Sequence, residues 1–174
     1  MSNYLKQIKS QENILYNNIL LLSRNKIFYT KLNLTDTFQN RINLIFIHIS
    51  FLFIKIKQNS QNQIYKVFYQ EMFDLIFNKI EINMREIGFG DVIVNKNMKF
   101  LVKTFYSILL NCENYNKKSI FLKNYFFSKF LQQNNTKKNS NYDDLIEYFN
   151  KYYSFCLDLS SDSVLKGDFN FDYK

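Results

Sequence analysis

The stretch MREIGFGDVIVNKNMKF, residues 84–100, decides how the chain folds, because it separates two long segments with helical hydrophobic spacing. The chain has three glycines and no proline in 174 residues, and two of the glycines, Gly88 and Gly90, lie in this stretch. Glycine adopts positive φ angles without the steric penalty of a Cβ atom, so it commonly follows helices. We therefore expect Gly88 to end one helix and residues 89–91 to form a turn that folds the next helix back.

The segment before the glycines, about residues 61–87, has apolar residues at steps of three and four, which predicts a long amphipathic helix. Arg85 would lie in its last turn, where a cation interacts favourably with the helix dipole. The predicted buried face consists of Ile64, Phe68, Met72, Leu75, Ile76, Ile80, Met84 and Ile87, widened by Tyr69, Phe73 and Phe77.

The segment after the glycines predicts a helix over about residues 95–112, with Met98, Leu101, Val102, Phe105 and Leu109 facing inward. Its lysines, Lys96, Lys99 and Lys103, recur at i, i+3 and i+7 and so form one outward stripe. Antiparallel packing of the two helices would bring the acidic residues of 71–91 near this stripe, where surface ion pairs contribute about 0–1 kcal/mol each.

The remaining sequence is also helical in pattern, so we predict an all-α fold: one compact domain of about six to seven helices with a short extended C-terminal tail. Residues 1–24 would form an N-terminal helix and residues 25–171 the rest of the same globular unit. Further helices are expected at 12–26, 36–57, 117–131 and 142–157, connected by a short turn at 27–34, a polar turn at 57–63 and a polar linker at 132–141. The first of these helices has Ile14, Leu15, Ile19 and Leu22 on one side. Asp36 with Gln39 would cap the second helix, and Asn141 with Asp144 the last.

The most apolar segment, INLIFIHISFLFIKI at 42–56, is shorter than the roughly 20 apolar residues that span a bilayer and is interrupted by polar side chains. We expect it to be a helix buried on all sides. His48, in its middle, is expected to be a hydrogen-bonded core residue and not a ligand or base. The polar N-terminus has no signal-peptide pattern.

The net charge of +8 is unevenly distributed, with Lys and Arg predominating in residues 1–66 and 95–140 and acidic residues in 67–94 and 141–174. Basic segments suit an anionic partner such as ribosomal RNA, lipid headgroups or an acidic protein. The abundance of Phe, Tyr, Asn, Lys and Ile is equally typical of an AT-rich genome, and both explanations stay open.

Several kinds of chemistry are disfavoured by the sequence. Cys112 and Cys156 with one histidine cannot supply the four ligands of a zinc site, so we expect two buried thiols in a reducing compartment and no metal. The GFG sequence is half of a dinucleotide-binding fingerprint and follows a helix instead of a strand, and no phosphate-binding P-loop motif occurs. We therefore expect neither a cofactor nor enzymatic activity.

The aromatic segment SIFLKNYFFSKFL, residues 119–131, has large apolar residues on every side of a predicted helix. Positions 120, 121, 124, 127 and 131 are predicted to face the core. Phe126 and Phe130 would then lie outside as an apolar patch suited to contact with another protein.

Residues 73–106 resemble the central motif of the ubiquinol–cytochrome c chaperone family. The matching positions are Glu81, Asn83, Arg85, Glu86, Gly88, Gly90, Asp91, Lys96, Lys99, Phe105 and Tyr106, and the resemblance extends to Phe28, Tyr29, Asp36, Arg41, His48, Gly167 and Phe171. The sequence departs from the family pattern at Asn40, where glycine is usual, at Ser107-Ile108, which replace Gly-Arg, and in lacking a terminal proline.

The resemblance implies a helical assembly chaperone for the cytochrome bc₁ complex (respiratory complex III) that binds newly made cytochrome b, in mitochondrial relatives with a small partner protein and near the ribosome. Because the family-like region begins close to the N-terminus, we expect a bacterial protein that works in the cytoplasm, peripheral to the inner face of the inner membrane, or at the matrix side if the protein is eukaryotic. The alternative is a basic ribosome- or RNA-associated protein, although no motif for sequence-specific nucleic-acid binding is present.

The candidate client- or partner-binding residues are Glu81, Arg85, Glu86, Asp91, Lys96, Lys99 and Lys103, with Gly88 and Gly90 as the structural turn. Arg85 and Glu86 have two interpretations. They either pair with neighbours and hold the turn, or form a charged patch that docks a partner.

Overall fold

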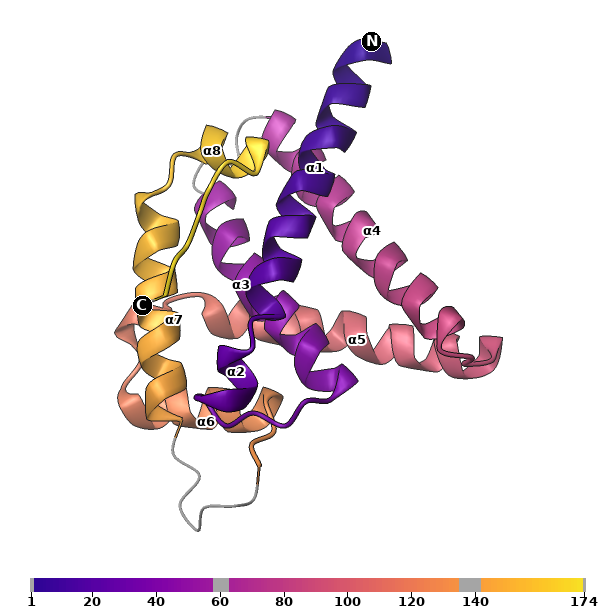
Figure 1. The fold of residues 1–174 in the computed structure, drawn as a ribbon. Coiled ribbons are helices and arrows are strands. Elements are labelled where there is room, and N and C mark those ends of the chain that lie inside the picture. Colours follow the sequence, from indigo (N-terminus) through magenta and orange to yellow (C-terminus); the bar gives the residue numbers. More distant parts are fainter. Residues whose placement is uncertain (1, 58–62, 135–141, 174) are drawn as a thin grey trace.

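The most apolar helix, α3 (Phe38–Lys57), lies at the centre of the molecule and is contacted by α1, α4, α5, α7 and α8. The structure is a computed structural model that describes residues 2–57, 63–134 and 142–173 (Figure 1). From Ile42 to Phe53 every residue of α3 is buried, as expected for a helix with neighbours on all sides. Across the described residues, no helix is long and apolar enough to cross a membrane.

The all-α prediction is confirmed: the described residues form helices joined by short loops, with a single isolated bridge between Leu34 and Gln133. The other elements are α1 (Ser2–Ser23), α2 (Ile27–Thr30), α4 (Gln63–Glu86), α5 (Asp91–Cys112), the 3-10 turn η1 (Tyr115–Lys117), α6 (Ile120–Phe130), α7 (Asp143–Asp158) and α8 (Ser161–Lys166). Figure 1 shows α4 and α5 meeting at one corner of the molecule and diverging from it, so they are not the closely antiparallel pair that we expected.

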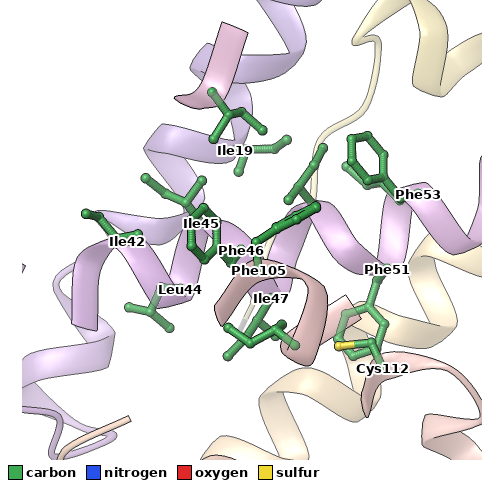
Figure 2. Packing of buried hydrophobic residues seen from close by; sticks show 14 of the residues in the cluster. Ile19, Ile42, Leu44, Ile45, Phe46, Ile47, Phe51, Phe53, Phe105 and Cys112 are labelled. Atoms are coloured by element: carbon green, nitrogen blue, oxygen red, sulfur yellow. The ribbon is translucent and has the colours of Figure 1, made fainter. Parts of the chain in front are cut away.

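Aromatic side chains join α3, α4 and α5 into one core. The ring of Phe46 on α3 lies 5.3 Å from that of Phe105 on α5 and 5.5 Å from that of Phe77 on α4. Figure 2 shows Phe46 and Phe105 among the aliphatic residues of α3. Because each ring contacts two other helices, this cluster fixes the angle at which α4 and α5 leave their common turn.

The prediction that His48 is a hydrogen-bonded core residue is confirmed. Its Nδ1 atom lies 2.7 Å from the carbonyl oxygen of Leu44, and its Nε2 atom lies 2.9 Å from the hydroxyl of Tyr148 on α7. A carbonyl only accepts, so Nδ1 carries the proton and Nε2 accepts from Tyr148. Burial lowers the pKa of His48 to about 4, which leaves the ring neutral at pH 7.

The N-terminal cap of α3 differs from the prediction. The Oγ1 atom of Thr37 accepts the bond from the backbone N–H of Asn40, so Thr37 and not Asp36 caps the helix. Asp36 instead forms a two-pronged ion pair with Arg41, with a shortest N–O distance of 2.6 Å. The predicted cap from Asn141 lies outside the described residues.

The C-terminal segment is only partly extended, because residues 161–166 form α8 and only residues 168–173 lack regular structure. Gly167 ends α8 with φ +66°, and a Cβ atom there would come within 2.8 Å of the backbone nitrogen of Leu15. The Nδ2 atom of Asn18 donates to the carbonyl of Gly167 at 2.7 Å. Gly167 therefore allows the C-terminal segment to contact the backbone of α1.

Two predicted helix faces need correction at their edges. Leu15 and Ile19 on α1 are buried, but Ile14, which we placed beside them, is exposed. On α4 the predicted face is buried at Phe68, Met72, Ile76, Ile80 and Met84 and partly buried at Leu75, whereas Ile87 is exposed because the helix ends at Glu86. The side chain of Ile64 lies outside what the structure describes.

The predicted inward face of α6 is correct only in part: Phe127 and Leu131 are buried as expected, but other positions are reversed. Phe126 is buried, and Phe130 packs partly against the core, whereas Ile120 and Phe121 are exposed. Ser119 caps α6 by accepting from the backbone N–H of Leu122 at 3.3 Å. The exposed apolar patch therefore exists, but different residues form it.

Candidate functional site

The corner between α4 and α5 is built on a glycine in the left-handed region. Gly88 has φ +99°, its N–H donates to the carbonyl of Arg85, and the N–H of Phe89 donates to that of Met84. These two bonds form a Schellman motif, which ends the helix and satisfies its last carbonyl groups. The predicted role of Gly88 as the helix-ending residue is confirmed.

Gly90 has a different role from the one we predicted. Its φ of −71° is available to any residue, and a Cβ atom added there would meet no heavy atom within 4 Å. Gly90 is the N-cap residue of α5, whose first bonds run from the N–H groups of Ile93 and Val94 to the Gly90 carbonyl. The helix therefore begins at Asp91, four residues before the predicted start, and the turn is shorter than we expected.

Arg85 connects the two helices at this corner. Its guanidinium bonds Glu81 one turn earlier on α4, at 2.9 Å from Nη2, and also pairs with Asp91 in the first turn of α5. The hydrogen bonds that Arg85 donates to Asp91 and to Glu81 raise the pKa of its guanidinium. Asp91 also lies at the N-terminus of α5, where a negative charge interacts favourably with the helix dipole. Three of the predicted site residues are thus brought together, with Arg85 between the two carboxylates.

The predicted lysine stripe is exposed along α5. Lys96, Lys99 and Lys103 are exposed, and among the described residues none of them takes part in an ion pair. The predicted pairs with the acidic residues of 71–91 do not form, since Glu81 and Asp91 bind Arg85 and the two helices diverge. Glu86 is also exposed and outside these ion pairs. These four charges therefore face solvent.

Exposed apolar side chains surround these charges, and the sequence analysis did not predict them. Val92 is 83% exposed, Phe100 58% and Ile93 51%, while Ile87 and Phe89 project from the turn itself. Val92 precedes Lys96 by four residues, and Phe100 precedes Lys103 by three, so these apolar and basic side chains are neighbours on the helix surface. The sequence contains a signal for them, because Val92, Ile93 and Phe100 are apolar but do not belong to the residues predicted to face inward.

We call the exposed surface formed by Ile87, Phe89, Val92, Ile93, Lys96, Lys99, Phe100 and Lys103 the corner surface. It combines apolar contact area with unneutralised positive charge on a rigid corner. Such a surface can bind an extended or helical segment that is apolar and carries acidic groups. It has no grouping typical of catalysis, and no cluster of three potential metal ligands occurs among the described residues.

The family model described as "Ubiquinol-cytochrome C chaperone" matches residues 30–171, which include the whole corner surface. The chain belongs to this family. The crystal structure of the Cbp3 homolog from Brucella abortus has a similar fold, with a TM-score of 0.80 and 20% sequence identity over 99% of this chain and 94% of that chain. A comparison with curated protein sequences gives no match.

The matched region contains the Arg85 ion pairs, the Gly88 turn and all of α3 to α8. Of α2 it contains only the last residue, Thr30. At 20% identity the Brucella structure establishes a shared fold, from α1 to the C-terminal segment. The corner surface therefore lies within a fold that this chain shares with the Brucella protein.

Proposed function

We propose that the protein is an assembly chaperone of the cytochrome bc₁ complex that holds newly made cytochrome b before its partner subunits join, without catalysis. The family assignment supports the assembly role. The observation that carries the client-binding part is the corner surface, where three lysines outside any ion pair of the described residues lie among exposed apolar side chains. A newly made membrane protein exposes apolar segments before it is assembled, and those that carry acidic groups complement such a surface.

Holding requires contacts that are individually weak. Exposed ion pairs contribute about 0.2–1 kcal/mol each, so several lysines together give useful affinity while each contact remains reversible. The corner itself does not need to change shape, because the Arg85 ion pairs and the Phe46–Phe105 contact hold α4 and α5 in place. Release follows when the client forms better-matched contacts within the assembling complex, which shifts the equilibrium by mass action.

The proposal includes partners and a location. A small co-chaperone and the ribosome are proposed as neighbours during client capture, since a basic surface favours association with rRNA or an acidic protein. The protein is proposed to work at the inner face of the bacterial inner membrane, or the matrix side in a mitochondrion, in peripheral contact with the bilayer. No sequence-specific contact with nucleic acid is proposed.

Deletion of the gene tests the assembly role. We expect the amount of assembled cytochrome bc₁ complex to fall, with other respiratory complexes unchanged, and the chaperone gene supplied in trans to restore it. Normal levels of cytochrome b and of the assembled complex in the deletion strain would contradict the proposal.

A further inference from the structure

The exposed face of α6 is apolar over the first half of the helix. Ile120 is 67% exposed, Phe121 77%, Leu122 47% and Tyr125 63%, all within the first six residues of the helix. Phe121 and Tyr125 are four residues apart and therefore lie one above the other on the same side. The opposite side is fixed in the core by Phe126 and Phe127, whose rings lie 5.0 Å apart.

Basic residues flank this apolar face at both ends. Lys117 and Lys118 precede α6, and Lys129 lies in its last turn. The sequence has no acidic residue between Glu113 and Asp143. Lys123, on the other side of the helix, is not part of the face: it is buried, donates to Asn150 Oδ1 at 2.8 Å and lies 4.4 Å from the centre of the Tyr115 ring.

We propose that this face of α6 is the surface by which the protein binds an anionic lipid bilayer. A helix that lies in the membrane interface buries apolar side chains about 5–10 Å deep and keeps its lysines at the headgroups. The eleven residues of α6 give a contact roughly 16 Å long. Phe121 and Tyr125 would enter the interface, and the lysines at the ends of the helix would extend to the phosphates.

The arrangement of charge favours a bilayer over a protein as the occupant of this face. On α5 the lysines occupy the middle of the exposed side, where insertion into lipid would bury them. On α6 the middle is apolar and the lysines lie at the ends, as in helices that lie flat on membranes. The segment from 114 to 142 also has no acidic residue of its own, which fits the negative potential of a cytoplasmic leaflet.

This inference rests on the peripheral membrane position proposed above and is independent of client capture. The chain contains no tryptophan, so Phe121→Trp introduces a single fluorescent probe into the face, and Phe100→Trp on α5 is the matched control. With vesicles of phosphatidylcholine and phosphatidylglycerol, we expect a blue shift of the emission for Phe121→Trp and none for Phe100→Trp. No shift at position 121, or an equal shift at both positions, would overturn the proposal.

Co-sedimentation with the same vesicles gives a second readout. Replacing Lys117, Lys118 and Lys129 by Gln should weaken vesicle binding about a hundredfold, since each basic residue near an anionic surface contributes roughly fivefold. The equally charged control Lys96→Gln/Lys99→Gln/Lys103→Gln should lose much less. Phe121→Ser should weaken binding roughly tenfold or more. Equal binding to vesicles without phosphatidylglycerol would overturn the proposal.

Recovery of cytochrome b from detergent extracts separates this inference from the proposed function. If the α6 variants lose vesicle binding and still recover cytochrome b, both proposals stand. Should they keep vesicle binding but lose the client, the face binds protein and the membrane inference is overturned.

Discussion

Arg85, in the last turn of α4, pairs with Asp91, in the first turn of α5, and so connects the two helices across the Gly88 turn. The same guanidinium binds Glu81, which orients it toward the turn. Of the two interpretations of Arg85 that the sequence leaves open, this geometry supports the structural one. The lysines of α5 then remain as the charges available to a partner.

Arg85→Gln should loosen the turn without unfolding the protein. The variant loses the pairs to Glu81 and Asp91, both on the surface, so the global melting temperature should change little. Amide hydrogen exchange at residues 87–94 should accelerate, and Asp91→Asn should have a similar effect. Arg24→Gln, at another exposed arginine, is the control. Unchanged exchange at the turn in both variants would show that the ion pair does not hold it.

The two glycines of the turn should respond differently to alanine. Gly88→Ala should destabilise the protein by about 1–2 kcal/mol, because its φ of +99° is unfavourable for a residue with a Cβ atom. Gly90→Ala should change stability by only about 0.5 kcal/mol or less, since its φ is ordinary and the space around it is open. Urea unfolding measures both. An equal loss in the two variants would contradict the assignment of the turn.

The lysine stripe should contribute to client binding and not to folding. Lys96→Gln/Lys99→Gln/Lys103→Gln should weaken client capture roughly tenfold if each contact contributes about 0.5 kcal/mol. Thermal unfolding should be unchanged, because the three side chains are exposed. The control Lys26→Gln/Lys31→Gln/Lys166→Gln makes the same charge change at exposed sites elsewhere. Equal losses of client in the two variants would indicate an effect of net charge alone.

Acid should destabilise the fold through His48. The pKa of about 4 in the folded protein lies below the ordinary 6.5, so the unfolded chain takes up a proton more readily as the pH falls. The free energy of unfolding is therefore highest above pH 6.5 and falls progressively down to about pH 4, by about 3 kcal/mol in total. Urea unfolding across this range should show a weaker pH dependence for His48→Gln. An identical pH dependence in both proteins would contradict the assignment.

The parts of the fold that the sequence predicted correctly are those with one dominant signal. The continuous apolar run of α3 can only be buried, and the three- and four-residue steps of α4 allow one buried face from Phe68 to Met84. Gly88 was predictable because it follows the last periodic residue. The lysine stripe was predictable because a charged row at helical spacing faces solvent.

The errors occur where the local sequence allows two answers. On α6, apolar residues lie on all sides, and the burial of Phe126 against Phe127 and Phe130 leaves Ile120 and Phe121 outside. Lys123 would be placed outside by its charge, yet the Tyr115 ring and Asn150 hold it inside. The apolar part of the corner surface was missed because the early start of α5 places Val92 and Ile93 on a helix instead of in a loop.

Client binding is tested by recovering the tagged protein from solubilised native membranes and identifying the proteins that are recovered with it. We expect cytochrome b to be co-recovered with the wild-type protein and with the Lys26→Gln/Lys31→Gln/Lys166→Gln control, and to be depleted with the Lys96→Gln/Lys99→Gln/Lys103→Gln variant. Absence of cytochrome b from the wild-type sample, in cells that are assembling the bc₁ complex, would contradict it.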